Sequence, residues 1–518
     1  MLFHGSMERP RPRFPGLDGA LAVGVAIGLT ELAAGLSSGI PSAIAAVGGF
    51  VVDVSPPFAK DFAISVFGTS DKGALAIGTV AIALLVGVVV GRLAASRFWV
   101  AWAAFSAFAV LGVAAQLSEP GAEPVLVLLA TPLAALAGTA VLELLFRADA
   151  AAFRPADPTD GRASDASRRR FVVGAAGAGI AGAAAVGLGR WATIRRSETL
   201  RVATGLPPVD FAVPDPGPDN QFLVPGITEL VQHEPRFYRI DTALVVPVVD
   251  VESWTLRVHG MVDHEVVLTM DDLRAMRQHE RYVTLSCVSN PVGDDLVGNA
   301  KWQGARLTEV LDLARPSQGA EQIVGRSVDG FTVGFPTNVA YDGRDPLIAI
   351  GMNEVPLPRK HGYPARLVVP GLYGYVSATK WLSEIELTTW DGFDAYWVPR
   401  GWAKEAPIKS QSRIDVPRAS EPIHAGRNTA AGVAWAPHRG ISRVEVQLDE
   451  EPWTDALISV PLSDDAWVQW VTSIEVPAGR HRLRVRATDA TGETQIEERS
   501  DVRPDGATGW HTVTFSAG

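Results

Sequence analysis

Long apolar runs dominate the first 190 residues of the chain, and short mixed segments make up the rest. Five runs of 18 to 23 residues contain few charges, at 19–36, 73–91, 98–117, 124–146 and 171–189. An α-helix rises about 1.5 Å per residue, so each run can cross the hydrocarbon core of a bilayer, which is about 30 Å thick. We therefore expect residues 1–196 to form an all-α domain of about five transmembrane helices.

A further apolar segment, residues 38–57, is interrupted by Pro41, Asp53 and the pair Pro56-Pro57. Proline breaks the hydrogen bonding of a helix, and a charge is costly inside a bilayer. We interpret the segment as an interfacial or re-entrant piece, with a sixth span as the alternative.

Arginine placement predicts the orientation of the spans. Arginines precede the first run, separate the second from the third, and separate the fourth from the fifth: Arg9, Arg11, Arg13, Arg92, Arg97, Arg147, Arg154, Arg162 and Arg168 to Arg170. Five spans place all three groups on one side, which is cytoplasmic by the positive-inside rule. The chain after residue 196 is then outside, although Arg190, Arg195 and Arg196 fall there and weaken the rule locally.

Two motifs lie in or beside the fifth run. Ser167-Arg168-Arg169-Arg170-Phe171 resembles a twin-arginine export signal, and a simple positively charged flank is the alternative. That export route carries folded proteins and suits a domain that takes up its cofactor before crossing. The segment from Gly177 to Gly182 matches the dinucleotide pattern G-x-G-x-x-G, but no strand precedes it. Small residues for close helix packing are the better interpretation.

The residues after 196 fall into three segments that differ in their pattern of polar and apolar positions. Residues 197–235 are rich in Pro, Asp and Gly and read as a linker and entry loop. Residues 236–415 mix short strands and helices in an α+β pattern, with strands expected at 254–260, 281–287 and 365–371 and helices at 269–276 and 306–314. Residues 416–518 alternate apolar and polar positions, as at 442–449 and 481–489, which predicts an all-β immunoglobulin-like sandwich.

Composition narrows the function. The 518 residues are 47% hydrophobic and 20% charged, as expected for a membrane domain joined to a soluble one. The net charge of −11, which comes from the second half, argues against a nucleic-acid partner. A single cysteine excludes an intramolecular disulfide framework and multi-Cys metal sites. No histidine lies in an apolar run and no C-x-x-C-H motif occurs, so no haem is predicted.

The cysteine, Cys287, ends an apolar strand and opens a loop. A lone cysteine is most often an inert buried thiol. However, the junction of a strand with a loop is where functional side chains are commonly presented. The neighbouring residues therefore decide between the two interpretations.

Those neighbours carry a resemblance to a known family. Thr284 to Asn290 (TLSCVSN) and Trp302 to Leu307 (WQGARL) resemble the T-L-x-C-x-x-N and W-x-G-x-x-L motifs of the sulfite oxidase family. His361 to Gly371 (HGYPARLVVPG), followed by Lys380-Trp381, resembles its H-G-x-P-x-R-x-x-x-P-G and K-W motifs. The resemblance covers residues 236–518, including the β-rich tail, and does not extend to the membrane half.

The resemblance implies a molybdenum-molybdopterin cofactor (Moco). Cys287 would be the metal ligand, and a soft thiolate is suited to such a centre. Arginine and lysine are suitable partners for the pterin phosphate. The cofactor-binding residues implied in this way are Phe237, Tyr238, Arg239, Asp241, His361, Arg366, Ser377 and Lys380, with Arg239 also implied as catalytic.

The chain departs from the family at positions that bind an anion. Val292 stands where sulfite oxidases have arginine, Ile350 where they have tyrosine, and Asp241 where they have histidine. Arg439 aligns only loosely with another anion-contacting arginine of the family. A doubly charged anion needs cations to leave water. These departures put sulfite in doubt as the substrate. Some family members instead reduce sulfoxides, which are neutral and need no such cluster of cations.

We therefore predict a membrane-anchored, molybdopterin-dependent oxidoreductase of a bacterial plasma membrane, with its catalytic domain outside the cytoplasm. It would transfer an oxygen atom to or from a small sulfur compound and exchange electrons with an external carrier or a quinone-linked membrane partner. Three alternatives stay open: a sulfoxide reductase of the same family, a hydrolase using Cys287 and His361, and a non-catalytic surface binding protein.

Overall fold

The computed structural model describes residues 12–55, 71–153, 161–199 and 205–518. The chain forms two compact units, one of residues 1–202 with 243–248 and one of residues 203–242 with 249–518. Arg9, Arg11, Pro56, Pro57 and Arg154 lie outside the described residues, as do the side chains of Asp53 and Arg162.

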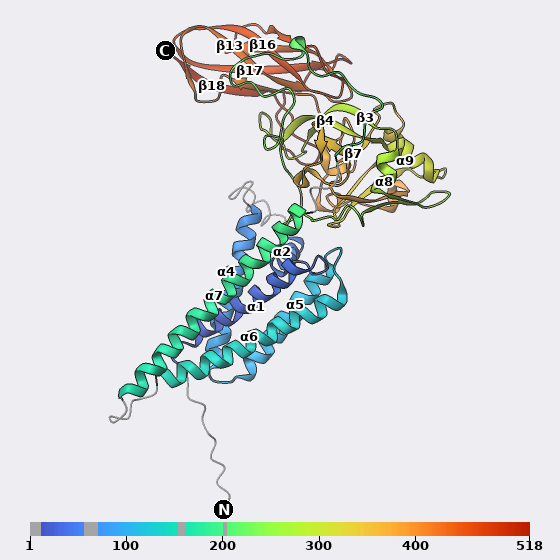
Figure 1. Ribbon diagram of the computed structural model, residues 1–518. Helices are drawn as coiled ribbons and strands as arrows, with labels where there is room; N and C mark the ends of the chain where they lie inside the picture. Colours follow the sequence, from blue (N-terminus) through green and yellow to red (C-terminus); the bar gives the residue numbers. More distant parts are fainter. Residues whose placement is uncertain (1–11, 56–70, 154–160, 200–204) are drawn as a thin grey trace, which may run out of the picture. The chain divides into compact units, whose positions relative to one another are not determined.

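The first unit contains the predicted helices. Five of its helices are long and apolar enough to cross a membrane, which confirms the five apolar runs as helices (Figure 1): α1 (Pro15–Leu36), α4 (Asp71–Ala94), α5 (Trp99–Ser118), α6 (Pro124–Ala152) and α7 (Gly161–Thr199).

The shorter helix α2 (Ala43–Val54) has 12 residues and cannot by itself cross a bilayer. Its N-cap, Ser42, hydrogen bonds to Ala45 N at 3.2 Å and to both carboxylate oxygens of Glu31 at 2.9 Å. This short helix agrees with the interpretation of the segment as interfacial or re-entrant.

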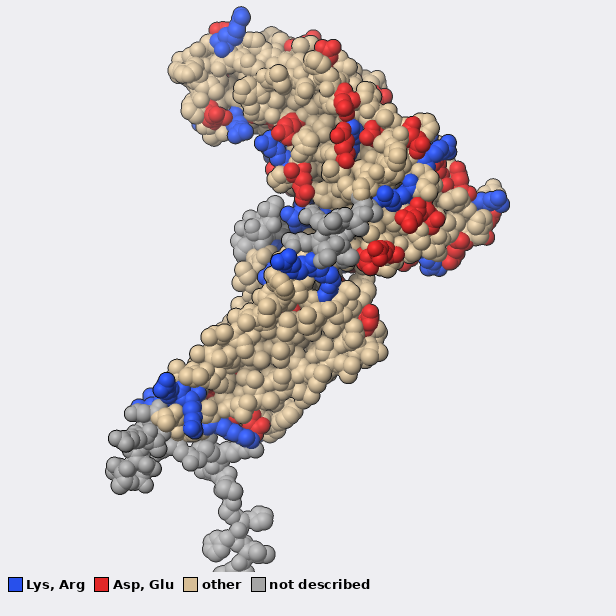
Figure 2. Space-filling view, viewed as in Figure 1, with Lys and Arg blue, Asp and Glu red and all other residues tan. Residues whose placement is uncertain are grey.

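Three of the helix ends that carry arginines meet at one end of this unit. The Phe14 ring before α1 contacts the rings of Phe153 and Phe171, at centroid distances of 5.4 and 6.2 Å. Arg92, near the end of α4, lies beside Gly16. The flank of the unit is almost free of charge, whereas lysines and arginines gather at its ends (Figure 2). The arginine groups before α1, after α4 and after α6 thus share one end, as five spans require.

Glycines hold the helices together. A Cβ at Gly28 of α1 would lie 2.5 Å from the carbonyl oxygen of Gly182 in α7, and one at Gly35 would lie 2.3 Å from that of Gly189. On another face of α1, a Cβ at Gly19 would lie 2.1 Å from Gly87 O of α4. Gly182 is the last glycine of the G-x-G-x-x-G match, and the packing interpretation holds for it, whereas a Cβ at Gly177, the first glycine, would meet nothing within 4 Å.

We predict that Gly28→Leu will destabilise the helical unit by about 1–3 kcal/mol, because the side chain must push α1 away from the backbone of α7. The measurement is the thermal unfolding midpoint of the full chain in detergent. Gly78→Leu in α4 is the matched control, since a Cβ there meets nothing within 4 Å. An equal midpoint for both variants would contradict the packing argument.

The second unit begins with an α+β region, as predicted. One sheet has the strand order β2-β1-β10-β5-β6, and another runs β3-β4-β7-β8, with β9 paired to β7. The bounds are β1 (Thr255–Gly260), β2 (Val266–Thr269), β3 (His279–Ser286), β4 (Val297–Arg306), β5 (Gln322–Ser327), β6 (Thr332–Pro336), β7 (Leu347–Met352), β8 (Val355–Pro356), β9 (Arg366–Val368) and β10 (Leu382–Thr388), with helices α8 (Met270–Ala275), α9 (Leu307–Ala314) and α10 (Gly374–Ser377). Thr269 caps α8, and its side chain accepts from Asp272 N.

The C-terminal region is all-β. Its strands follow one continuous order, β11-β13-β16-β15-β14-β17-β18-β12. They are β11 (Gln411–Val416), β12 (Pro422–Ile423), β13 (Gly426–Trp435), β14 (Ile441–Leu448), β15 (Thr454–Ile458), β16 (Val468–Val476), β17 (Gly479–Asp489) and β18 (His511–Ala517). Alternate residues of β14 and β17 are buried, including Val444, Val446, Leu483 and Val485. The all-β prediction is confirmed, and the immunoglobulin-like assignment stays a prediction.

The segment 205–235, part of the predicted linker and entry loop, belongs to the second unit and is hydrogen-bonded to its strands. Asp210 N donates to Gln278 O beside β3 at 2.9 Å, and Thr228 N donates to Asp415 in β11 at 2.9 Å. Between them, Phe222 N donates to Gln469 of β16 at 2.6 Å. An extended proline-rich backbone exposes its polar groups, and strand edges and side chains satisfy them here.

Candidate cofactor site

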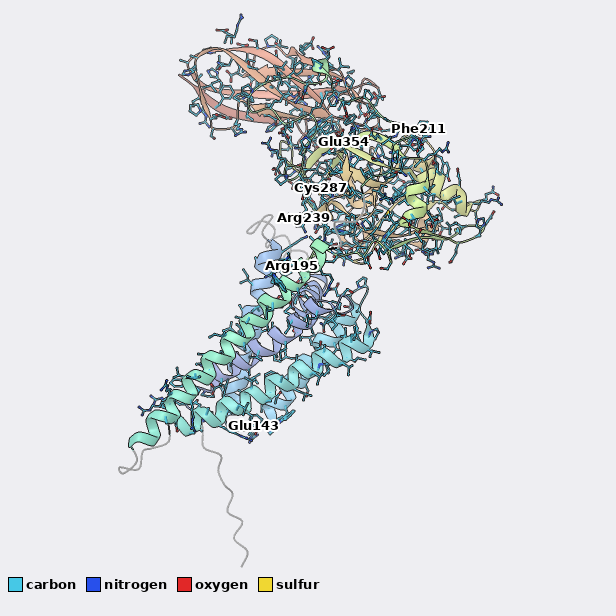
Figure 3. The ribbon with its side chains drawn as sticks, viewed as in Figure 1. Glu143, Arg195, Phe211, Arg239, Cys287 and Glu354 are labelled. Carbon is cyan, nitrogen blue, oxygen red and sulfur yellow. The ribbon has the colours of Figure 1, made fainter. Side chains whose placement is uncertain are left out.

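Cys287 follows β3 directly, and its position is fixed by the sheet. Ser286, the last residue of β3, pairs with Val297 of β4. Cys287 N donates to Leu296 O at 2.9 Å, and Cys287 O accepts from Asn290 N at 3.1 Å. The thiol is buried, which raises its pKa, while the backbone N–H and hydroxyl of Ser289 lower it. The sequence prediction of a cysteine at a strand-to-loop junction is confirmed, and Figure 3 labels it together with Arg239.

The loop after Cys287 is held by the C-terminal region. Gly293 has φ +89°, and a Cβ there would lie 2.1 Å from Cδ2 of His511 in β18. Arg413 in β11 donates through Nη1 to Asp294 O at 2.9 Å. Sequence reasoning missed Gly293, His511 and Arg413 as residues that position the site, and the glycine in the loop was the only local signal.

Four basic side chains lie near one another beside this loop. His361 and Arg366 come from the turn before β9 and its first residue, and Lys380 precedes β10. Gly362, at φ +112°, brings them together, because a Cβ there would lie 3.0 Å from Cβ of Arg366 and 3.1 Å from Cα of Lys380. Asp241 links Arg239 to this group, because its carboxylate accepts hydrogen bonds from Arg239 Nε and from Lys380 Nζ, both at 2.9 Å.

Within the described parts of the chain, carboxylates only partly balance the positive charge of this cluster. Arg366 is 4% exposed, and Nη1 and Nε donate to the carbonyl oxygens of His361 at 3.0 Å and Leu367 at 3.3 Å. Its guanidinium lies 4.8 Å from the ring centroid of Trp302, and no ion pair with it is found among the described residues. Asp241 is the carboxylate that both Arg239 and Lys380 share.

The pKa values of Lys380, His361 and Arg366 are lowered, as expected for basic groups whose positive charge is not fully compensated. Burial lowers the pKa of Lys380 to about 8, even though Asp241 opposes that shift. Burial and the nearby charges of Arg366, Lys380 and Arg239 lower the pKa of His361 to about 3, so its imidazole is neutral at pH 7. Burial likewise lowers the pKa of Arg366 to about 10. An anion among these groups would favour their charged forms.

Aromatic rings form one wall of the site. Phe237 stacks on Tyr238 at a centroid distance of 5.3 Å, and its ring meets those of His361 and Trp302 edge-on at 5.5 and 5.7 Å. Burial raises the pKa of Tyr238, with Cys287 raising it further and Arg366 opposing. Tyr238 therefore lies among the same groups as Cys287 and Arg366.

The contacts of Ser377 and Asp241 change the interpretation of these two predicted cofactor-binding residues. The hydroxyl of Ser377 is 3.0 and 3.2 Å from the carbonyl oxygens of Tyr373 and Leu372, so its single donor is used within its own turn. This arrangement does not favour Ser377 as a phosphate donor. Asp241, which the sequence suggested as a negative charge near the pterin, is neutralised by Arg239 and Lys380.

The donor set fits a pterin phosphate and a soft metal. A buried thiol, three cations with one carboxylate between them, a neutral imidazole and an aromatic wall converge from β3, the segment 237–241 and the segment 361–380. No group of three His, Cys, Asp or Glu side chains that could hold a metal by themselves occurs in the described part of the chain. A metal at Cys287 would need its other ligands from a cofactor.

A Cys-His hydrolase is not supported by this geometry. No hydrogen bond joins Cys287 to His361 among the described residues, and the pKa of His361 near 3 makes it a weak base. A nucleophilic cysteine needs such a base within hydrogen-bonding reach.

Comparison with known proteins identifies the family. A family model described as an oxidoreductase molybdopterin binding domain matches residues 243–397. An uncharacterised oxidoreductase of Bacillus subtilis, YuiH, is 31% identical over 153 residues, which are 30% of this chain and 74% of that protein. The chain belongs to the sulfite oxidase family of molybdopterin-binding oxidoreductases. Family membership confirms the resemblance read from the motifs around Cys287 and His361.

Other family members cover the chain more widely. Human mitochondrial sulfite oxidase is 29% identical over 314 residues, 51% of this chain and 55% of the human protein. Sulfite oxidase of Arabidopsis thaliana is 27% identical over 339 residues, 53% of this chain and 85% of the plant protein. The chain thus spans about half the length of the human relative. The sulfane dehydrogenase SoxCD of Paracoccus pantotrophus aligns in structure with a TM-score of 0.49 and 22% identity, over 55% of this chain and 81% of that one.

His511, which supports the Cys287 loop, makes the second unit sensitive to acid. Burial and the charge of Arg413 lower the pKa of His511 to about 4, and its Nδ1 accepts from Ile414 N at 2.9 Å. The unfolded chain binds a proton at this residue below about pH 6.5, whereas the folded chain does not until about pH 4. Stability is therefore fully present above about pH 6.5 and falls by up to about 3 kcal/mol on the way to pH 4.

We predict that His511→Asn, whose amide oxygen can accept from Ile414 N, will reduce this loss of stability. The measurement is the urea unfolding free energy of the second unit, followed by tryptophan fluorescence, across that pH range. His424→Asn, at an exposed histidine of the same region, is the control. An unchanged pH slope in His511→Asn would show that other groups carry the acid sensitivity.

Proposed function

We propose that this chain is a membrane-anchored Moco enzyme that exchanges an oxygen atom with a small sulfur compound. The observation that carries the proposal is the position of Cys287 beside a cluster of basic groups that lacks matching carboxylates. When bound, the cofactor would supply a metal that can donate an oxygen atom while it accepts two electrons, or accept an oxygen atom while it gives two electrons up.

Different residues of the protein would bind the metal, the phosphate and the pterin of this cofactor. Cys287 would ligate the metal, and Arg366, Lys380 and Arg239 would bind the phosphate, with His361 as a neutral hydrogen-bonding partner. Phe237, Tyr238 and Trp302 would exclude water from the pterin side. Asp241 would orient Arg239 and Lys380.

The groups near Tyr373 suggest which substrate would enter. Burial raises the pKa of Tyr373 to about 12, with Asp505 and Cys287 acting in the same direction and Arg439 opposing, so these groups lie near one another. Arg439 Nε donates to Asp489 at 2.8 Å, and Lys409 Nζ donates to Asp505 at 2.9 Å. Both cations are thus paired within the protein. Together with Val292 and Ile350 at the departing positions, this favours a neutral sulfoxide over the sulfite dianion.

The five apolar helices support anchoring in a membrane. The arginines gathered at one end would face the cytoplasm of a bacterium, which would put the catalytic region outside, and Ser167 to Phe171 would then act as an uncleaved twin-arginine signal. Electrons would pass to or from an external carrier or a quinone-linked membrane partner. Sulfite oxidation is the second candidate, because the human and plant relatives are sulfite oxidases.

The proposed ligand roles predict two different losses of cofactor. Cys287→Ser should lose molybdenum but retain pterin, since the phosphate cluster is intact, whereas Arg366→Met should lose both. The measurement is metal content by mass spectrometry and pterin content by fluorescence of the oxidised extract. Arg326→Met is the control, because Arg326 pairs with Glu386 away from this cluster. A folded wild-type protein without molybdenum, expressed in a host that makes Moco, would favour the non-catalytic alternative.

The substrate assignment predicts the effect of restoring the family's arginine. We expect wild type to reduce a neutral sulfoxide more efficiently than it oxidises sulfite, and Val292→Arg to lower the KM for sulfite about tenfold, because a cation near the thiol loop offsets the desolvation of the anion. The measurement is kcat/KM for both reactions with artificial electron carriers. Val292→Met, which adds volume without charge, is the control. Efficient sulfite turnover by wild type would overturn the neutral-substrate argument.

A further inference from the structure

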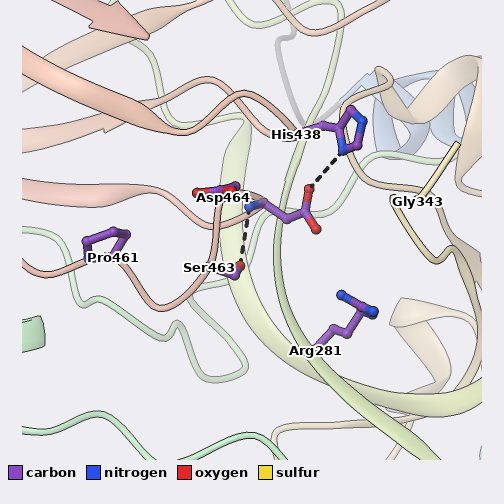
Figure 4. Close-up of a pocket in the computed structure, with 7 residues that line it drawn as sticks. Arg281, Gly343, His438, Pro461, Ser463 and Asp464 are labelled. Atoms are coloured by element: carbon purple, nitrogen blue, oxygen red, sulfur yellow. Dashed lines mark hydrogen bonds and ion pairs between the residues drawn. The ribbon is translucent and has the colours of Figure 1, made fainter. Parts of the chain in front are cut away.

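A pocket lined by residues other than the proposed cofactor ligands lies where the C-terminal region meets β3. It has a volume of about 490 Å³ and is lined by Arg281, Gly343, His438, Pro461, Ser463, Asp464 and Asp465 (Figure 4). Arg281 is six residues before Cys287 on β3, which corresponds to about 20 Å along an extended strand. The pocket is within the size range of small-molecule sites.

The walls of the pocket are fixed by hydrogen bonds. The hydroxyl of Ser463 donates to Tyr282 O at 2.9 Å, and Thr284 N donates to Asp465 O at 2.9 Å. Two residues further on, Trp467 N donates to the hydroxyl of Thr284 at 2.8 Å. The loop from Ser463 to Trp467 thus runs along the edge of β3 and is held there by these hydrogen bonds.

Asp465 is the unusual group in this pocket. It is 7% exposed, and its Oδ1 has no hydrogen-bond partner. The nearest base is Nδ1 of His438, at 3.9 Å, beyond hydrogen-bonding distance. Burial, with the charge of Arg344 adding to it, lowers the pKa of His438, so this imidazole brings no positive charge at pH 7. A buried carboxylate without a donor requires a partner or a proton.

Among the charged side chains described around the pocket, carboxylates outnumber guanidinium groups by one. Arg281 and Arg306 both pair with Asp345, and Arg344 pairs with Asp342. Asp464, at the exposed rim, and Asp465 have no arginine or lysine paired with them among the described residues. The three guanidinium groups therefore face four carboxylates. No group of three metal-ligating side chains occurs here in the described chain, so an organic cation fits better than a metal ion.

We propose that this pocket binds a small primary amine in its ammonium form, with the N–H groups directed to Asp465 and Asp464. An ammonium group supplies the missing charge and the missing donors together, and the volume leaves space for a short organic body. This site is separate from the cofactor site, so it does not rest on the proposed reaction.

The test measures binding to the full chain in detergent by calorimetry at pH 7.5. The probe is propylammonium, and the comparison ions are tetramethylammonium, which has no N–H, and propionate. We expect saturable binding of one propylammonium per chain, with tetramethylammonium and propionate at least about tenfold weaker. No saturable binding at tens of millimolar, or equal binding of the three ions, would overturn the proposal.

Variants make the test specific. Asp465→Asn should weaken binding about tenfold or more, and Asp455→Asn, an exposed carboxylate of β15, should leave it unchanged. If Asp465→Asn does not fold, His438→Lys serves instead, because a tethered ammonium should occupy the site, prevent propylammonium binding and raise the unfolding temperature. Unchanged binding in a folded Asp465→Asn or His438→Lys would overturn the proposal.

The pH dependence of propylammonium binding is an independent test of the role of Asp465. Burial raises the pKa of Asp465 to about 6, against the lowering effect of Arg281 and Arg344 and with the raising effect of Asp464. Propylammonium binding should therefore strengthen as the pH rises through about 6, and protonation of His438 at lower pH acts in the same direction. Binding that strengthens as the pH falls would contradict the role of Asp465.

Discussion

Positive charge that is buried without matching negative charge is the constraint on which the catalytic region depends. Arg366 and Lys380 are almost fully buried, and with Arg239 they have one carboxylate, Asp241, among them. Removing a cation from water costs several kcal/mol unless a partner compensates. The carbonyl oxygens of His361 and Leu367 and the face of Trp302 compensate Arg366 only in part. An anionic cofactor, as proposed above, would complete this arrangement.

The backbone around the cluster follows from the same constraint. Gly362 allows the turn before β9 to approach Lys380 closely, because a Cβ there would lie only 3.1 Å from Lys380 Cα and the φ of +112° is one that other residues rarely adopt. His361, surrounded by cations, stays neutral and can therefore accept as well as donate a hydrogen bond. The thiol of Cys287 follows β3 of the sheet that also contains β9, and its position depends on the Gly293 loop, which the C-terminal region supports through His511. Cofactor binding and packing between the two regions are thus coupled.

Local signals explain what could be predicted from the sequence. The cap at Thr269, the alternation in β14 and β17, and the strand that ends at Cys287 each depend on neighbouring residues, and each was found. The pairs Gly293–His511, Arg413–Asp294 and Thr228–Asp415 join residues more than a hundred positions apart and leave no local pattern. Ser377 was assigned by its place in a motif, but nearby carbonyl oxygens compete for its hydroxyl.

The two groups of cations near Cys287 differ in a way that bears on chemistry. Those around His361 exceed their carboxylates, whereas Arg439 and Lys409, which lie near Tyr373, are each paired with an aspartate. Excess charge requires a permanently bound anion, because a site that released it would return to an uncompensated state. Paired cations carry no such requirement and gain little from a transient anion. Under the proposed function, the anion of a bound cofactor would suit the first environment and a neutral, exchanging substrate the second.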